Sequence, residues 1–142
     1  MNTGIIKKID HIAVAVRDID EAIRVFRDQL GLSMTKTYHS EYTRAHIAFF
    51  RVGETHVELI QPTSLSSVMA KFLDKRGEGI HHVCLGVKNI DEVLVSLATK
   101  GMELIDEKPR MTQDGRKIAF VNPRSTHGVL IELTEIEEQG TE

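Results

Sequence analysis

The chain has 142 residues, of which 41% are hydrophobic, and its net charge is −3 at pH 7. This length suits one core or two small modules that share a core, and the lack of any run of lysines or arginines argues against a nucleic-acid-binding protein. No apolar run approaches the roughly 18 residues of a membrane span, and the single cysteine, Cys84, excludes an internal disulfide, so we expect a cytoplasmic protein with neither nucleic-acid nor membrane partners.

The first half of the chain carries the signals of a strand, a helix and three further strands. Alternating apolar residues predict a strand at residues 9–16. Asp18 and Glu21 then form a capping-box pattern, and Gly31 marks the end of the helix that they begin. Three extended segments are predicted after this helix, at residues 33–38, 44–52 and 55–61.

The second half repeats this order after a connecting helix. Apolar residues at helical spacing predict the connecting helix between residue 65 and Gly77. A strand is predicted next at residues 80–87, and a helix runs from the cap residue Asn89 to Gly101. Three more extended segments are predicted, at residues 103–108, 116–122 and 128–134.

The two halves are copies of one module. His11 and His82 are 71 positions apart, and the segments "HIAFF" and "KIAFV" keep the same spacing. Glu58 and Glu132 are 74 positions apart, so a loop of the second copy has gained three residues. We therefore predict an α+β fold of two tandem βαβββ modules in a single domain of residues 1–142. The repeats span about residues 7–62 and 78–136, and a helical linker joins them.

Strand alternation selects one histidine in each copy. Every second residue of a strand points to the same face, so His11 shares a face with small alanines, and His82 shares one with Cys84. The larger apolar residues point to the other face, where the helix is expected to pack. His81 lies on that opposite face, and it matches Asp10 rather than His11. His82 is therefore the counterpart of His11.

Two glutamates occur at matching places in the last strand of each copy. Glu58 and Glu132 both stand between large apolar residues, where an uncompensated buried carboxylate would be costly. A divalent cation compensates two carboxylates and accepts neutral imidazoles as ligands. We expect the duplicated residues to converge on one metal site, with His11, Glu58, His82 and Glu132 as its ligands.

Longer motifs resemble one superfamily over nearly the whole chain. These are "IDHIAVAV" with "DIDEAI", "ETHVELIQP", "AKFLDKRGEGIHHVCLGV", "KIAFVNPRSTHGVLIELTE" and "LIDEKPR". They are similar to the vicinal oxygen chelate (glyoxalase/bleomycin resistance) superfamily, and within it to the methylmalonyl-CoA epimerase family. The resemblance implies a cupped mixed or antiparallel sheet with a metal in its hollow. It matches His11, Glu58, His82 and Glu132 to the four ligand positions.

The resemblance also implies an activity, which we state as an expectation. It is the interconversion of the (R) and (S) forms of methylmalonyl-CoA, by proton abstraction through an enolate that a divalent ion stabilises. Cobalt, manganese, nickel, zinc and magnesium all suit mixed nitrogen and oxygen ligands. Glu132 is implied as one proton carrier, and we take Glu58 as the second because Ile47 stands where some epimerases have another acid. The expected partners are an acyl-CoA substrate and a second copy of the chain in a homodimer.

Other functions remain open from the sequence. The nearest is a glyoxalase I-like lactoylglutathione lyase, which uses the same ligand set and enolate chemistry. A metal-free drug-sequestering protein fits the four ligands poorly, and an extradiol-type dioxygenase uses two histidines and one carboxylate on iron. Five basic residues could meet phosphates or remain in solvent: Lys71, Arg76, Arg110, Lys117 and Arg124.

Overall fold

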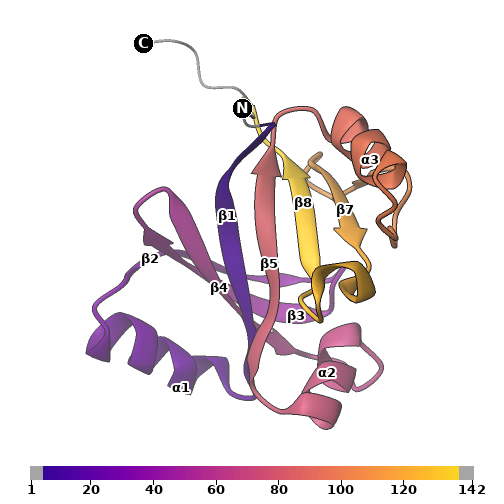
Figure 1. The fold of residues 1–142 in the computed structure, drawn as a ribbon. Coiled ribbons are helices and arrows are strands. Elements are labelled where there is room, and N and C mark those ends of the chain that lie inside the picture. Colours follow the sequence, from indigo (N-terminus) through magenta and orange to yellow (C-terminus); the bar gives the residue numbers. More distant parts are fainter. Residues whose placement is uncertain (1–4, 138–142) are drawn as a thin grey trace. The chain divides into compact units, whose positions relative to one another are not determined.

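The computed structural model describes residues 5–137, which form two compact units (Figure 1). The N-terminal unit comprises residues 11–81, and the C-terminal unit comprises residues 5–10 together with residues 82–137. No helix within residues 5–137 is both long and apolar enough to cross a membrane.

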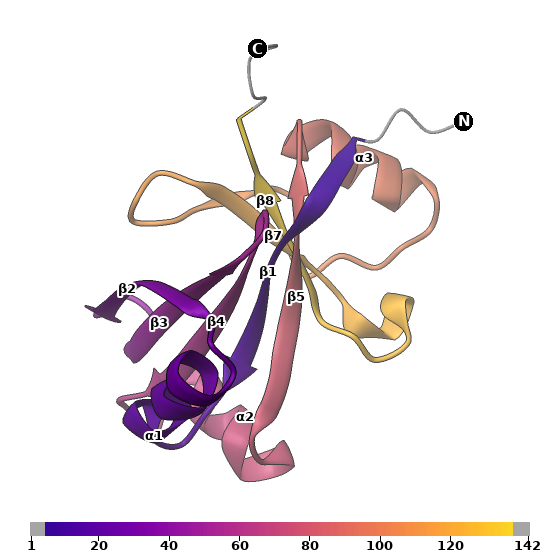
Figure 2. The same ribbon diagram turned by 90° about the vertical axis from the view of Figure 1, so that its left-hand side faces the viewer.

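The N-terminal unit contains a four-stranded sheet with helices against it (Figure 2). Its strands follow the order β2-β3-β4-β1, with β1 parallel to β4 and β3 antiparallel to both of its neighbours. β1 begins in the C-terminal unit and continues here. The elements are β1 (Ile6–Ala15), α1 (Ile19–Ile23), η1 (Arg24–Gln29), β2 (Ser33–Ser40), β3 (Ala45–Val52), β4 (Thr55–Pro62) and α2 (Val68–Arg76).

The helix of the N-terminal unit begins as predicted but changes type along its length. The Asp18 side chain accepts a hydrogen bond from the Glu21 backbone N–H, which caps the first turn of α1. From Arg24 the chain continues as the π-helix η1 rather than as the regular helix that the sequence predicted. The helix packs on the sheet face that carries Phe50 and Leu59, both fully buried, so this face holds the core of the unit.

The C-terminal unit repeats the architecture with shorter outer strands. Its strands follow the order β5-β8-β7-β6, with β5 parallel to β8 and β7 antiparallel to β8 and β6. Figure 1 shows α3 beside β7 and β8. The elements are β5 (Gly79–Val87, with its first three residues in the N-terminal unit), α3 (Ile90–Thr99), β6 (Arg110–Met111), β7 (Lys117–Val121), the 3-10 helix η2 (Pro123–Thr126) and β8 (Ile131–Glu135).

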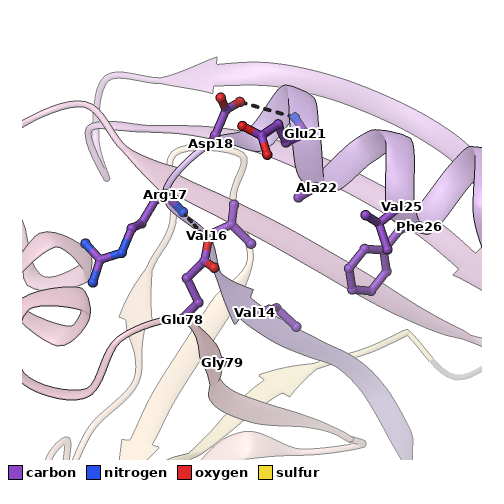
Figure 3. A pocket seen from close by; sticks show the side chains of 10 residues that line it. All are labelled: Val14, Val16, Arg17, Asp18, Glu21, Ala22, Val25, Phe26, Glu78 and Gly79. Atoms are coloured by element: carbon purple, nitrogen blue, oxygen red, sulfur yellow. Dashed lines mark hydrogen bonds between the residues drawn. The ribbon is translucent and has the colours of Figure 1, made fainter.

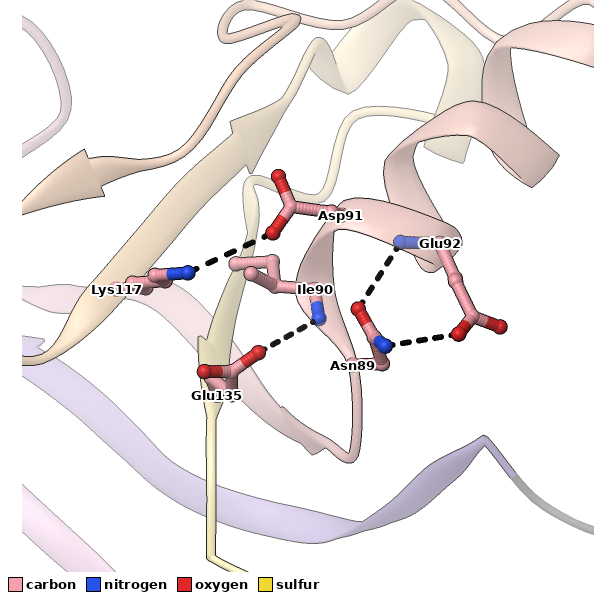
Figure 4. Close-up of polar contacts among 6 residues, drawn as sticks. All are labelled: Asn89, Ile90, Asp91, Glu92, Lys117 and Glu135. Carbon is pink, nitrogen blue, oxygen red and sulfur yellow. Dashed lines mark hydrogen bonds and ion pairs between the residues drawn. The ribbon is translucent and has the colours of Figure 1, made fainter.

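Polar contacts fix the start of α3 against its sheet (Figure 4). Asn89 accepts from the Glu92 backbone N–H and donates to the Glu92 carboxylate, so the predicted cap is confirmed. The Ile90 backbone N–H donates to the Glu135 carboxylate of β8 at 3.1 Å. The face of α3 that follows packs with β5, β7 and β8 into a second core, which includes the fully buried Leu94.

One predicted strand is wrong. The sequence predicted an extended segment at residues 103–108, but only Leu104 makes an isolated bridge there, and β6 lies beyond it at Arg110–Met111. The Phe120 backbone N–H donates to the Asp106 carboxylate at 2.9 Å, so a side chain takes the place of the backbone carbonyl that a regular strand would offer it. The order of strand, helix and three strands is nevertheless present twice, which confirms the α+β fold class.

Candidate metal centre

The N-terminal unit brings together His11 and Glu58. β1 and β4 are parallel neighbours, and their register sets Ala13 opposite Glu58. His11 is two positions before Ala13, so it lies on the same face of the sheet. We call this the site face, and it is opposite the face that packs on α1. His11 is 4% exposed and Glu58 is 8% exposed. The His11 Nε2 lies 3.3 Å from the Glu58 Oε1, so an imidazole and a carboxylate meet in a buried pair.

The C-terminal unit contains the matching pair, His82 and Glu132. Cys84 of β5 lies opposite Glu132 of β8, and His82 is two positions before Cys84 on the same face. His82 and Glu132 are each 7% exposed, and the His82 Nε2 lies 2.9 Å from the Glu132 Oε1. Each of the four residues selected from the sequence is therefore buried, and each histidine contacts the glutamate of its own copy.

A phenylalanine ring stands edge-on to each of these histidines. Phe49 of β3 has its ring centroid 6.3 Å from that of His11, at an interplanar angle of 88°. Phe120 of β7 has the same relation to His82, at 5.9 Å and 86°. The two phenylalanines are 71 positions apart, which is the spacing of the histidines themselves. The sequence analysis matched the segments that contain these phenylalanines, but it assigned the two rings no role at the site.

A cation lies over each of these phenylalanine rings. The Lys36 ammonium is 5.1 Å from the Phe49 centroid, and the Arg110 guanidinium is 5.3 Å from the Phe120 centroid. Sequence reasoning missed Lys36 entirely and left Arg110 among several surface cations. His56, which the sequence analysis did not single out, is half-buried and lies opposite His11 in the β1–β4 ladder.

The electrostatics of the C-terminal unit keep Arg116 positively charged. Burial disfavours its charge, but the carboxylates of Asp114, Glu132 and Asp10 raise the pKa of the guanidinium above its ordinary value. Arg116 therefore supplies positive potential toward Glu132. The pKa of Asp114 is lowered, chiefly because it accepts a hydrogen bond from the Thr112 hydroxyl, with Arg116 adding to the effect.

The donor atoms fit a divalent metal ion. Imidazole nitrogens and carboxylate oxygens are the ligands that zinc, cobalt, nickel and manganese take from proteins. His11, His82 and Glu132 are all buried groups of this kind, and Glu58 adds a second buried carboxylate. Buried carboxylates without a cation would be costly. The burial of both His–Glu pairs therefore supports a metal-binding role for them.

A separate groove lies on the other side of the N-terminal sheet (Figure 3). It has a volume of about 570 Å³, and its apolar floor includes Val14, Val16 and Phe26. The Arg17 backbone N–H donates to the Glu78 carboxylate at 2.8 Å within it. Neither His11 nor Glu58 lines this groove, so it is distinct from the site face.

Comparison with known proteins shows the family to which the chain belongs. The model of the family described as "Glyoxalase/Bleomycin resistance protein/Dioxygenase superfamily" matches residues 10–120. The uncharacterized protein YqjC of Bacillus subtilis (strain 168) is 38% identical over 128 residues, which cover 90% of this chain and 91% of that protein. Methylmalonyl-CoA epimerase from Mycobacterium tuberculosis has a similar crystal structure, with a TM-score of 0.86 at 33% identity over 97% of this chain and 93% of that one. A structure of methylmalonyl-CoA epimerase in complex with methylmalonyl-CoA and NH4+ is also similar, with a TM-score of 0.83 at 30% identity over 92% of this chain and 94% of that one.

Proposed function

Because the chain belongs to the glyoxalase/bleomycin resistance protein/dioxygenase superfamily, we propose that it is a metal-dependent epimerase that interconverts (R)- and (S)-methylmalonyl-CoA. The observation that carries the proposal is the buried His–Glu pair, which occurs once in each unit. Epimerases of this substrate are among the relatives with the same fold, and one of them has methylmalonyl-CoA bound. The substrate of this chain is our inference from that similarity.

We infer that the two pairs together hold one divalent ion. His11 and His82 would supply neutral nitrogens, and Glu58 and Glu132 would supply two negative charges that balance the charge of the cation. When bound, such an ion acts as a Lewis acid that stabilises negative charge developing on a carbonyl oxygen. Cobalt, manganese, nickel, zinc and magnesium are the candidates.

The two glutamates are also our candidates for the proton transfers. Epimerisation removes the proton from the carbon between the thioester and the carboxylate, and returns a proton on the opposite face. This requires a group that carries a proton on each side of that carbon. Glu132 and Glu58 come from different copies of the module, so we assign one to each face. The alternative position, Ile47, is apolar and packs in a hydrophobic cluster on β3, so it cannot carry a proton.

Solvent exchange tests the assignment directly. Metal-loaded protein and methylmalonyl-CoA are incubated in heavy water, and the loss of the proton signal at the reacting carbon is followed by proton NMR. The wild type should exchange this proton, and Glu132→Gln should slow the exchange by about 10²- to 10⁴-fold, the usual contribution of a positioned acid or base. Glu58→Gln should impair exchange from one face. Full exchange in both variants would falsify the assignment.

A parallel assay separates the proposal from its nearest rival. The hemithioacetal of methylglyoxal and glutathione is the substrate of a lactoylglutathione lyase, and its conversion is read by absorbance. We expect turnover of methylmalonyl-CoA and none of the hemithioacetal. The reverse result would reassign the protein to the lyase, with the same glutamates and metal. Size measurement in solution would test the homodimer that we also expect.

A further inference from the structure

A β-bulge turns Lys36 onto the site face of the N-terminal unit. Met34 lies opposite Phe50, but Lys36 lies opposite Phe49, so Thr35 is an extra residue in β2. The Thr35 hydroxyl donates to the Phe49 backbone carbonyl at 3.3 Å, which holds the irregularity. Regular pairing would have put Lys36 opposite Ala48, on the face that packs under α1. The bulge therefore reverses the face of the β2 residues that follow it, and it turns both Lys36 and Tyr38 toward the site face.

The re-aimed lysine lies in the same cross-strand row as Glu58. Strand pairing sets Lys36 opposite Phe49, and Phe49 opposite Glu58. Adjacent strands are about 4.8 Å apart, so the Lys36 and Glu58 backbones are separated by roughly 10 Å. The ammonium lies 5.1 Å from the centroids of both Phe49 and Tyr38, whose rings are stacked at 11°. The aromatic pair supports the lysine beside the buried carboxylate.

Among the residues that the structure describes, Lys36 pairs with no group of opposite charge. No ion pair joins Lys36 to a carboxylate anywhere in residues 5–137. The cation over the other phenylalanine differs in this respect, because the Arg110 guanidinium donates to Asp106 at 3.0 Å. Lys36 is therefore available to pair with an anion that arrives at the site face, whereas Arg110 is already paired with Asp106.

We propose that Lys36 binds the free carboxylate of the substrate and so selects acyl thioesters that carry a carboxylate next to the reacting carbon. This inference rests on the proposed function and names its specificity-determining residue. The row of residues explains why the anion is a carboxylate. A reacting carbon close to Glu58 has its own carboxylate within reach of the lysine, whereas the phosphates of coenzyme A lie at the far end of the pantetheine arm.

A pair of ligands that differ only in the carboxylate tests the proposal. Binding of malonyl-CoA and propionyl-CoA to metal-loaded protein is measured by isothermal titration calorimetry. Wild-type protein should prefer malonyl-CoA, and Lys36→Met should reduce this preference about 10- to 100-fold, the range of a hydrogen bond to a charged group. Affinity for propionyl-CoA should not change. Lys36→Arg should keep the preference, and Arg110→Met is the matched control because its charge is already balanced.

Three results would overturn the proposal. One is an unchanged preference in Lys36→Met. Another is an equal loss of affinity for both ligands, because that would mean contact with the shared coenzyme A phosphates. The third is a loss of preference for malonyl-CoA in Arg110→Met that is as large as the loss in Lys36→Met. Because calorimetry measures binding alone, its result does not depend on whether the protein catalyses the proposed reaction. A wild type that binds with this preference but does not exchange the proton would refute the epimerase and leave the carboxylate site intact.

Discussion

Replacement of Glu132 by leucine should remove most of the stabilisation that a bound metal gives to the protein. Glu132 is 7% exposed and contacts His82, so its charge has little water to solvate it and would be compensated by a bound cation. A ligand that binds only the folded state stabilises it by about 2.7 kcal/mol at a concentration of 100 Kd. For a chain of this length, that corresponds to a rise in Tm of about 8 °C.

The loss of metal-induced stabilisation in Glu132→Leu can be estimated. Disruption of residues that merely support metal ligands costs about 10- to 100-fold in affinity, so loss of a ligand should cost at least about 100-fold. At the same metal concentration the variant would then be half saturated, and its stabilisation would fall to about 0.4 kcal/mol, or about 1 °C. The measurement is the Tm by differential scanning fluorimetry, with and without each candidate metal. Each variant is compared with its own metal-free form, so a change in intrinsic stability cancels.

Two further variants complete this experiment. Glu58→Leu should lose the rise in Tm on addition of metal, as Glu132→Leu does, because we assign both residues as metal ligands. Glu41→Leu should keep it, because the Glu41 side chain is 88% exposed and lies outside either pair. An unchanged shift in Glu132→Leu would refute the metal site. An unchanged shift in Glu58→Leu alone would reduce the ligand set to the remaining three residues.

Two predictions concern stability without metal. Asp114→Asn should destabilise the protein slightly at pH 7, because the folded state lowers the pKa of Asp114 and therefore favours its charged form. Urea midpoints should show this difference in stability above about pH 4, the ordinary pKa of aspartate, and the difference should disappear as the pH falls through the lowered pKa. A difference that persists in acid would contradict this cause. Leu94→Ala should cost about 2–5 kcal/mol, because Leu94 is 2% exposed in the core under α3, whereas Val95→Ala, at a position 67% exposed on the same helix, should change the free energy of unfolding by less than about 0.5 kcal/mol.

Period and capping explain why most of the architecture was predictable. Alternation in "HIAVAV" placed His11 away from the helix, and the structure has it on the site face. The caps at Asp18 and Asn89 located both helix starts to the residue. The duplication then paired His82 with His11 and Glu132 with Glu58. The strand and helix inferences need only local backbone geometry, and the pairing needs only a comparison of the two repeats, so a sequence expresses both directly.

The face of Lys36 and the orientation of the connecting helix depend on information that a local sequence pattern does not contain. Lys36 was missed because alternation assumes unbroken pairing, and the bulge at Thr35 reverses the face. The apolar residues of the connecting segment share one side of a helix by spacing, yet Leu65 and Val68 are 94% and 73% exposed, while Leu73 is buried. Which side of a short helix meets the sheet depends on how the chain enters it, and the hydrophobic pattern of "SLSSVMAKFL" did not determine that.

The π-helix η1 records how the two copies diverged. The cap residues Asp18 and Asn89 are 71 positions apart, but the glycines that end the helices, Gly31 and Gly101, are only 70 apart. The first copy therefore contains one residue more between the same landmarks. A π-turn accommodates one additional residue in a helix, so the wide turns of η1 accommodate the extra residue and let the chain re-enter the sheet in register. The two copies thus differ by one residue here, and the difference is accommodated by a change of helix type instead of a displaced strand.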